Sequence, residues 1–422
     1  MKSGYLSDYF EGVAAKRLRS VEVDTRCSNQ HEYNATKAME KFLGRPGKKV
    51  QIPARFIYLN DDDAGPLVED AYLTYGDRRA GTVDNRTGKP RSEYRLYFPT
   101  TNVSLNSSEG DLLVIAKKRD GNLIVIVAEN GSSIGRQIEW LFGFSKLNHP
   151  GFSARSELET EQDRIAFSAR VVLENIGIVV ESRTDSCLDE MLEKFPAGFP
   201  STREFSAYAR STLADIHPID NPDSVLMTWM EREEILFRTL ERYLIADKLS
   251  KGFSPKGNGI VDTDGFLQFS LSVQNRRKSR VGLALENHLE IIFKENGIRY
   301  SRGVVTENRC KPDFLFPSIV EYRDPDFAHF NLTMLGVKST CKDRWRQILS
   351  EASRIPAKHL LTLQPSISEN QTKEMATENV QLVVPALLHS TYSSEQQKWL
   401  KDLNTFILMV REKQSGSALL NK

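Results

Sequence analysis

The chain has 422 residues, of which 40% are hydrophobic and 27% are charged, so it can fold into two or three domains and is not disordered as a whole. Its formal net charge of +1, from 57 basic and 56 acidic residues, excludes attraction to nucleic acid through overall charge and leaves only local basic patches. Its 4 cysteines lie far apart, its apolar runs are too short to cross a membrane and its start lacks a signal-peptide core, so we expect a cytoplasmic protein without a membrane span, a zinc ribbon or a disulfide scaffold.

Residues 1–145 form the first predicted domain, which is rich in short strands. A short helix is expected over 35–43, and the strands are expected over 54–59, 71–75, 94–98, 111–116 and 123–128. The last two strands flank Asp120-Gly121-Asn122, and Asp-Gly tolerates the positive φ of a tight hairpin turn. Because no long helix separates these strands, a small barrel or partial barrel is favoured over a parallel sheet.

Residues 146–200 are predicted to be a helical linker or hinge, with helices around 162–176 and 187–195. Two prolines and a glycine close together in 195–201 indicate a domain boundary. Residues 201–422 have the alternation of an α/β domain, in which helices flank a mixed sheet. The helices are expected over 202–214, 223–250, 281–296, 342–353 and 394–412, and the strands over 312–316, 334–338, 360–363 and 380–384.

An aspartate and a lysine stand at two predicted strand ends in this second domain. Asp313 begins the apolar strand Phe-Leu-Phe, and Lys338 closes the strand Met-Leu-Gly-Val-Lys. A phosphodiesterase needs such a pair, because the carboxylate holds a divalent cation and the lysine orients the attacking water. Nucleases of the PD-(D/E)xK kind carry a second acid two residues before the lysine, and here that position is Gly336.

The missing carboxylate can come from another element. Glu351 lies on the predicted helix after Lys338, and Glu286 lies on an amphipathic helix earlier in the chain. Seen alone, the trio Asp313, Lys338 and Glu351 is more often a strand cap, a solvated lysine and a surface charge.

Three blocks of this domain resemble the EcoRII-type restriction endonucleases. The blocks are Asn275–Glu290, Lys311–Ser318 and Val337–Leu349, and the similarity extends through roughly 196–412. The resemblance implies a PD-(D/E)xK endonuclease fold in which Asp313, Lys338 and Glu351 form the active site, since this family moves its second acid from the strand to the following helix. Glu286 is then a supporting acid, and Asp313 and Glu351 are the metal ligands.

The expected activity is site-specific cleavage of double-stranded DNA. Mg²⁺ is the expected cofactor, because only oxygen ligands are offered. A homodimer is expected, since the nearly palindromic sites of this family need two active sites. The resemblance also implies a cognate DNA methyltransferase that acts on the same site.

Two basic segments are candidate DNA contacts. By resemblance, Lys342, Asp343 and Arg344 read the C·G pairs of a site that contains CC and GG, whereas an ordinary first turn of a helix is the plainer interpretation. Arg276, Arg277, Lys278 and Arg280 are expected to contact phosphates, with a solvated loop as the alternative.

The family flips the central base of its site into a pocket made by an arginine and an aromatic residue. The corresponding positions here are Met230 and Glu234, which do not suit that role. Trp229 and Arg232 lie close by and could stack on the base instead.

The N-terminal domain weakly resembles the effector-binding domain of the family, a DNA-binding pseudobarrel. Its candidate effector-DNA contacts lie in two arms, with Asn29 and His31 in the first and Arg86, Lys89, Arg91 and Arg95 in the second. A solvated hairpin is an equally weighted interpretation of the second arm.

Two rival functions remain open at this point. One is a nuclease effector of a larger anti-phage defence system that partners recruit. The other is a DNA-binding regulator with an inactive nuclease fold, against which the intact Asp313, Lys338 and Glu351 argue.

Overall fold

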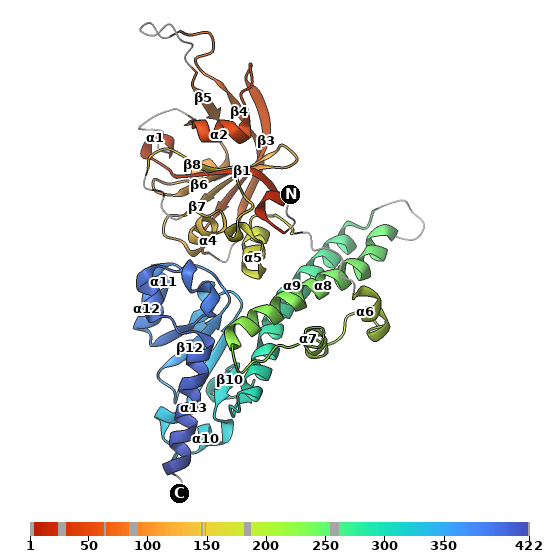
Figure 1. Ribbon diagram of the computed structural model, residues 1–422, viewed down its shortest axis with the longest axis vertical. Coiled ribbons are helices and arrows are strands. Elements are labelled where there is room, and N and C mark those ends of the chain that lie inside the picture. Colours follow the sequence, from red (N-terminus) through yellow and green to blue (C-terminus); the bar gives the residue numbers. More distant parts are fainter. Residues whose placement is uncertain are drawn as a thin grey trace. The chain divides into compact units, whose positions relative to one another are not determined.

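The computed structural model describes residues 4–23, 31–62, 65–83, 92–144, 147, 149–180, 187–253 and 261–420, without the side chains of 308, 342–344 and 416–420. The chain divides into two compact units (Figure 1). Unit 1 comprises 1–179 with 366–371, and unit 2 comprises 180–365 with 372–422. This division falls inside the segment 146–200, whose role as a hinge stays a prediction.

Unit 1 is built on one curled sheet, as Figure 1 shows. The strand order is β2-β5-β4-β3-β7-β6-β1-β8, and all pairs are antiparallel except β3 with β7. The strands are β1 (Phe10–Arg17), β2 (Glu32–Asn34), β3 (Val50–Leu59), β4 (Leu67–Asp77), β5 (Tyr94–Tyr97), β6 (Leu112–Lys118), β7 (Leu123–Ala128) and β8 (Ser153–Arg155). The helices are α1 (Ser20–Val23), α2 (Lys37–Leu43), α3 (Asn102–Asn106), α4 (Ser133–Leu141) and α5 (Phe167–Asn175), with 3-10 turns η1 (Leu6–Asp8) and η2 (Glu161–Asp163).

The centre of this sheet is its most apolar part. Every residue of β7 is buried, because this Val- and Ile-rich strand is covered on both faces. The β6–β7 hairpin predicted from Asp120-Gly121 is present, and Gly121 has the positive φ of +86° that this turn requires. The predicted β-rich N-terminal fold is therefore confirmed, although β1, β2 and β8 had not been predicted.

Unit 2 contains a mixed sheet with the order β13-β12-β11-β10-β9. β9, β10 and β11 pair antiparallel, whereas β11, β12 and β13 pair parallel. The strands are β9 (Ser301–Arg302), β10 (Phe314–Phe316), β11 (Thr333–Lys338), β12 (Lys358–Thr362) and β13 (Val380–Val383). The predicted α/β class with a mixed sheet among helices is confirmed.

The helices of unit 2 surround this sheet and extend beyond it (Figure 1). They are α6 (Leu188–Lys194), α7 (Thr202–Ser211), α8 (Pro222–Lys251), α9 (Thr263–Glu295), α10 (Ile319–Arg323), α11 (Glu369–Thr377), α12 (Ser394–Trp399) and α13 (Leu403–Leu420). The 3-10 helices are η3 (Glu307–Arg309), η4 (His329–Asn331), η5 (Lys342–Ser350) and η6 (Ala386–Thr391). None of the described helices combines the length and the apolar character that crossing a bilayer requires.

An aromatic cluster fixes α9 against the sheet. The Phe293 ring of α9 lies 5.2 Å from the Phe314 ring and 5.3 Å from the Phe316 ring of β10. All three side chains are buried, and aromatic rings packed edge to face add to the burial of their apolar area. The last turns of α9 are thereby held beside the strand that Asp313 precedes.

Three predicted helices differ from the observed ones. α9 begins at Thr263 rather than at 281, so residues 275–280 are helical and do not form a loop. The segment 394–412 is broken into α12 and α13. The segment 342–353 is the 3-10 helix η5, which ends at Ser350 and leaves Glu351 in an extended conformation.

Candidate active site

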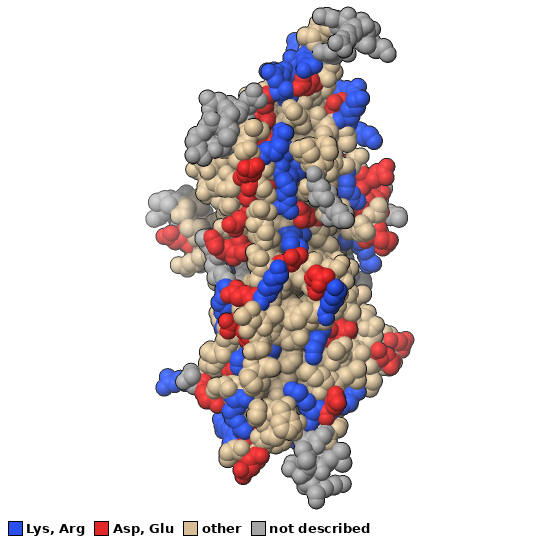
Figure 2. Space-filling view, turned by 90° about the vertical axis from the view of Figure 1, so that its left-hand side faces the viewer, with Lys and Arg blue, Asp and Glu red and all other residues tan. Residues whose placement is uncertain are grey.

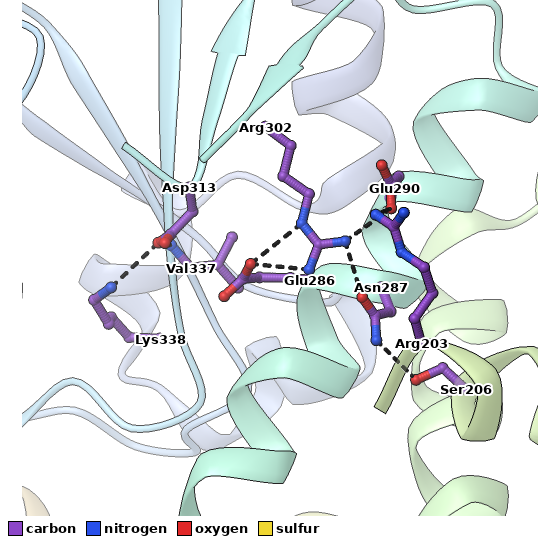
Figure 3. A network of polar contacts seen from close by, with 9 residues as sticks. All are labelled: Arg203, Ser206, Glu286, Asn287, Glu290, Arg302, Asp313, Val337 and Lys338. Atoms are coloured by element: carbon purple, nitrogen blue, oxygen red, sulfur yellow. Dashed lines mark hydrogen bonds and ion pairs between the residues drawn. The ribbon is translucent and has the colours of Figure 1, made fainter. Parts of the chain in front are cut away.

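Asp313 and Lys338 meet where β10 begins and β11 ends. The Asp313 Oδ2 atom accepts a hydrogen bond of 2.6 Å from the Val337 amide and lies 3.2 Å from the Lys338 ammonium (Figure 3). β10 and β11 pair antiparallel with Phe314 opposite Leu335, which brings the start of one strand to the end of the other. The two strand ends therefore place an acid and a lysine in direct contact, as predicted.

Glu286 approaches the same place from α9. Its Oε2 atom accepts hydrogen bonds from Arg302, at 3.0 Å from Nη2 and 3.3 Å from Nε (Figure 3). Burial raises the pKa of Glu286, the negative charge of Asp313 raises it further, and Arg302 and Lys338 oppose these effects. Glu286 is thus electrostatically coupled to both residues of the strand ends.

Glu351 reaches the site from a turn and not from a helix face. The turn follows η5, and the ammonium of the buried Lys358 donates to the backbone oxygens of Glu351, Ala352 and Ile355. Three carbonyl groups that point to one cation fix the course of the backbone from 351 to 355. The prediction that Glu351 projects from an α-helix is therefore wrong. Glu351 nevertheless lies near the strand ends, since the charges of Asp313 and Lys338 act on its carboxylate.

The carboxylate of Glu351 is strongly perturbed by its surroundings. Burial and the negative charge of Asp313 raise its pKa to about 7, against the opposing effect of Lys338 and Lys358. Its Oε2 atom is buried without a hydrogen-bond partner among the residues that the structure describes. Unpaired buried carboxylate oxygens are costly in the absence of a cation.

These side chains suit a divalent cation. Asp313 and Glu351 offer oxygen donors, which Mg²⁺ and similar hard cations prefer. The unpartnered Glu351 Oε2 and the mutual repulsion of the two carboxylates are features that a bound cation would relieve. Within the described part of the chain, no group of 3 or more Asp, Glu, His or Cys side chains lies close enough together to form a ready-made metal site.

Gly336 explains why no acid stands on the strand. A Cβ atom built on Gly336 would lie 2.7 Å from Cγ2 of Ile348, which is buried in η5. Such a distance is well inside van der Waals contact, so a side chain on this strand face would displace η5. The close approach of η5 to β11 thus excludes the usual acid and supplies Glu351 at the end of the same element.

The four predicted phosphate contacts lie on α9 but differ in their surroundings. Arg276 lies over the Phe199 ring at 4.4 Å, Arg277 is paired with Glu241 at 2.6 Å, and Lys278 is exposed. Arg280 is 6% exposed, forms an ion pair with the buried Glu233 and lies 3.9 Å from the centre of the Phe237 ring. The charge of Arg280 is neutralised in the helix core, so its contact with phosphate stays a prediction that would require this ion pair to open.

The surface carries no broad area of one sign on the face that Figure 2 shows. Basic and acidic side chains are intermingled there, in keeping with the net charge of +1. On this face, any attraction to DNA must arise from small groups of cations.

The two candidate base-pocket residues are enclosed by other side chains. Trp229 is 4% exposed, with the Arg210 guanidinium 5.7 Å from its ring centre. Arg232 donates from Nε to Thr212 at 2.8 Å and lies near Cys187. In this conformation Trp229 offers no open face to a base, so its use in base flipping stays a prediction that requires a rearrangement.

Several predicted DNA contacts lie outside the described residues. These are Asn29, Arg86, Lys89 and Arg91, together with the side chains of Lys342, Asp343 and Arg344. Of the remaining two, Arg95 of β5 is paired with Glu32 and Glu93, and the buried Nδ1 atom of His31 has no partner among described residues. β2 and β5 are paired neighbours in the sheet, so the strands that follow the two predicted arms lie side by side.

Two residues of the site were not foreseen from the sequence. Arg302 belongs to the two-residue strand β9, and Lys358 begins β12. Both act through charge on a neighbouring group, and neither stands in a recognisable spacing to its partner. A buried lysine at the start of an apolar strand is the one signal that the sequence offered, since a lysine is rarely buried without acceptors.

Part of unit 2 is similar in sequence to a known family of proteins. Residues 237–407 match the family model of the EcoRII C-terminal domain. The chain is 43% identical over 213 residues to the type II restriction enzyme EcoRII of Escherichia coli, a match that covers 50% of this chain and 50% of that enzyme. The chain thus spans about half the length of the curated relative that it matches.

Two solved structures are similar at lower identity. Metal-depleted Ecl18kI in complex with uncleaved, modified DNA is 18% identical with a TM-score of 0.44, covering 57% of this chain and 87% of that chain. The complex of restriction endonuclease PspGI with substrate DNA is 17% identical with a TM-score of 0.41, covering 52% of this chain and 94% of that chain.

Proposed function

We propose that the chain is a type II site-specific DNA endonuclease, a proposal supported by the match of residues 237–407 to the EcoRII C-terminal family model and by the 43% identity to EcoRII over 213 residues. The observation that carries the proposal is the contact of Asp313 with Lys338 at two strand ends, beside the carboxylates of Glu286 and Glu351. An acid and a lysine so arranged match the needs of phosphodiester hydrolysis.

Asp313 and Glu351 would hold a divalent cation, for which we propose Mg²⁺. A bound cation supplies Lewis acidity, which stabilises charge that develops on the scissile phosphate. Lys338 would orient the attacking water and neutralise charge on the phosphorane oxygens, since its ammonium already lies 3.2 Å from Asp313. Glu286 would keep a further negative charge next to this pair, where its carboxylate could accept a hydrogen bond from a water molecule or help to hold a cation.

The specificity that we propose is for a short duplex site that contains CC and GG. Lys342 and Arg344 are suited to guanine O6 and N7, and Asp343 is suited to the amine of cytosine. Arg276, Arg277 and Lys278 would contact phosphates from α9, and Arg277 would exchange its pair with Glu241 for a phosphate.

The remaining proposals concern partners. A homodimer would place two active sites on the two strands of a nearly palindromic site. A cognate DNA methyltransferase would protect the same site in the host genome. The endonuclease itself would be a cytoplasmic protein. Effector DNA would bind unit 1 through the arms that precede β2 and β5, where His31 directly precedes β2 and Arg95 lies on its neighbour β5.

The proposal is tested by incubating the purified full chain with phage genomic DNA and MgCl₂ and sequencing the ends. Discrete ends that share one short motif, produced only with the metal, are the expected result. Lys338→Ala should abolish cutting and leave duplex binding in CaCl₂ within about threefold, because Lys338 acts mainly on the transition state. Binding without cutting by the wild-type chain in Mg²⁺ and in Mn²⁺ would favour an inactive regulator.

A further inference from the structure

Arg302 occupies the centre of the polar network beside the candidate active site (Figure 3). It belongs to β9, which pairs with β10 so that Arg302 stands opposite Phe314. The next residue, Gly303, donates its amide to the backbone oxygen of Asp313 at 3.1 Å. The backbone of Arg302 is therefore fixed to the strand end that carries the candidate metal ligand.

The guanidinium of Arg302 reaches across to one face of α9. Its Nη1 atom donates to Asn287 Oδ1 and to Glu290 Oε2, both at 2.8 Å, and its Nη2 and Nε atoms donate to Glu286 Oε2. The side chain is only 15% exposed, so these charge-assisted bonds are shielded from solvent. The three acceptor residues stand at positions i, i+1 and i+4 of α9. Together they restrict the guanidinium to a single orientation.

The bonds to Glu286 are asymmetric. Both N–H groups of Arg302 converge on Oε2, and no described residue is hydrogen-bonded to Oε1. Figure 3 shows the Glu286 carboxylate lying between Arg302 on one side and the Asp313–Lys338 pair on the other. One oxygen is thus anchored, while the carboxylate remains next to the reacting groups.

We propose that Arg302 is the positioning residue of Glu286, which it anchors by Oε2 so that Oε1 is presented to the Asp313–Lys338 pair. This inference rests on the proposed function and assigns a part of its machinery. Anchoring by a planar fork fixes both the position and the plane of the carboxylate, which a point charge such as lysine does not. Arg302 itself does not reach the Asp313–Lys338 pair and acts through Glu286.

A purely structural role is the competing explanation, because Arg302 also ties β9 to α9 through Asn287 and Glu290. The structural and the positioning explanations can be separated because Asn287 and Glu290 each have a second partner. Asn287 is held independently by a 3.1 Å bond to Ser206 of α7, and Glu290 also binds Arg203 at 3.0 Å. Arg203→Gln is therefore a matched control, since it removes an arginine from the same network without touching Glu286.

The kinetic test uses the full chain and a plasmid that the wild type cuts. Arg302→Lys should lower kcat by about 10- to 100-fold, as loss of a partner that orients an active-site ligand usually does. KM and the affinity for duplex in CaCl₂ should stay within about threefold, and Arg203→Gln should keep kcat within about twofold. In a Glu286→Gln background the same Arg302→Lys change should have little further effect. Full additivity of the two losses would overturn the inference.

A second measurement does not depend on cleavage. In a crystal structure of Arg302→Gln without metal, the Glu286 carboxylate should rotate away from the Asp313–Lys338 pair while the backbone of α9 stays in place. An unchanged Glu286 side chain would overturn the positioning role even if kcat fell. A wild-type chain that cuts no DNA would instead refute the proposed endonuclease, and the crystal structure would still decide the role of Arg302.

Discussion

Individual buried basic side chains fix much of the geometry around the candidate site, and Lys358 is the clearest case. Its ammonium is the common donor for three backbone oxygens of the turn that begins at Glu351. The sequence could identify Glu351 as a candidate acid, but not the residue that places it. A lysine that bonds only to backbone carbonyls has no sequence partner that a motif could record.

Lys358→Met should remove the Glu351 turn while preserving most of the side chain's apolar volume. Each of the orphaned carbonyl groups costs roughly 1–3 kcal/mol when it is left buried and unsatisfied. We expect a lower urea midpoint and a loss of cleavage larger than the loss of stability explains. Lys398→Met is the control, because Lys398 is 71% exposed on α12 and pairs with Glu395 of the same helix. Equal losses of stability and of cleavage in the two variants would contradict the assignment of Lys358 as the residue that holds the Glu351 turn.

Arg280 shows how a basic residue in a predicted DNA-binding segment can instead form an ion pair in the protein core. Its partner Glu233 lies on α8, and His288 Nε2 lies 2.8 Å from the same carboxylate. Arg280→Met should destabilise unit 2 by about 3–5 kcal/mol, since it strands a buried charge. The salt dependence of DNA binding should be unchanged, whereas Lys278→Met should reduce its slope without altering stability. Denaturant titration and binding at several salt concentrations check both expectations.

At the scale of elements, the strands were the most predictable part of the fold. The segments predicted as strands within β3 to β7 are rich in Val, Ile and Tyr and bounded by turn residues, so local chemistry indicates them, although β3 and β4 extend beyond the predicted 54–59 and 71–75. The sequence did not indicate β9, because its two residues are ordered by pairing with β10. The sequence did not indicate the early start of α9 either, because its first turns leave apolar side chains such as Phe266, Leu267 and Leu271 exposed and so do not follow one buried face.

The packing of η5 on β11 offers a test of why the acid has moved. Gly336→Ala should lower stability by about 1–3 kcal/mol, because the new Cβ meets Ile348. Cleavage should fall with it, since η5 leads directly to Glu351. Gly336→Ala should cost less stability in an Ile348→Ala background than in the wild type, because the truncated side chain no longer meets the new Cβ. A double-mutant cycle in urea measures this coupling, and purely additive losses would count against the contact.

For the whole molecule, the question is whether unit 1 restrains unit 2. The cluster formed by α6, α7 and α8 includes Met191, which is fully buried. A fragment that starts at Phe195 would therefore lose part of that core, and a fragment 180–422 is the better choice. If unit 1 keeps DNA away from the candidate active site, this fragment should cut single-site DNA faster than the full chain does.

The comparison needs both a single-site and a two-site plasmid. Effector control predicts that the full chain prefers the two-site plasmid and that fragment 180–422 does not distinguish the two. A folded fragment with the same preference and rate as the full chain would show that unit 1 adds affinity without restraint. Circular dichroism on the fragment establishes that it is folded before the rates are compared.

The contact between Gly336 and Ile348 also bears on how such sites diverge. An acid two residues before the lysine and a bulky residue at 348 occupy the same volume, so one chain cannot carry both arrangements without displacing η5. An acid at 336 therefore requires a smaller residue at 348. Sequences that keep the carboxylate on the strand are expected to carry a small residue at the position of Ile348, so that the two positions change together.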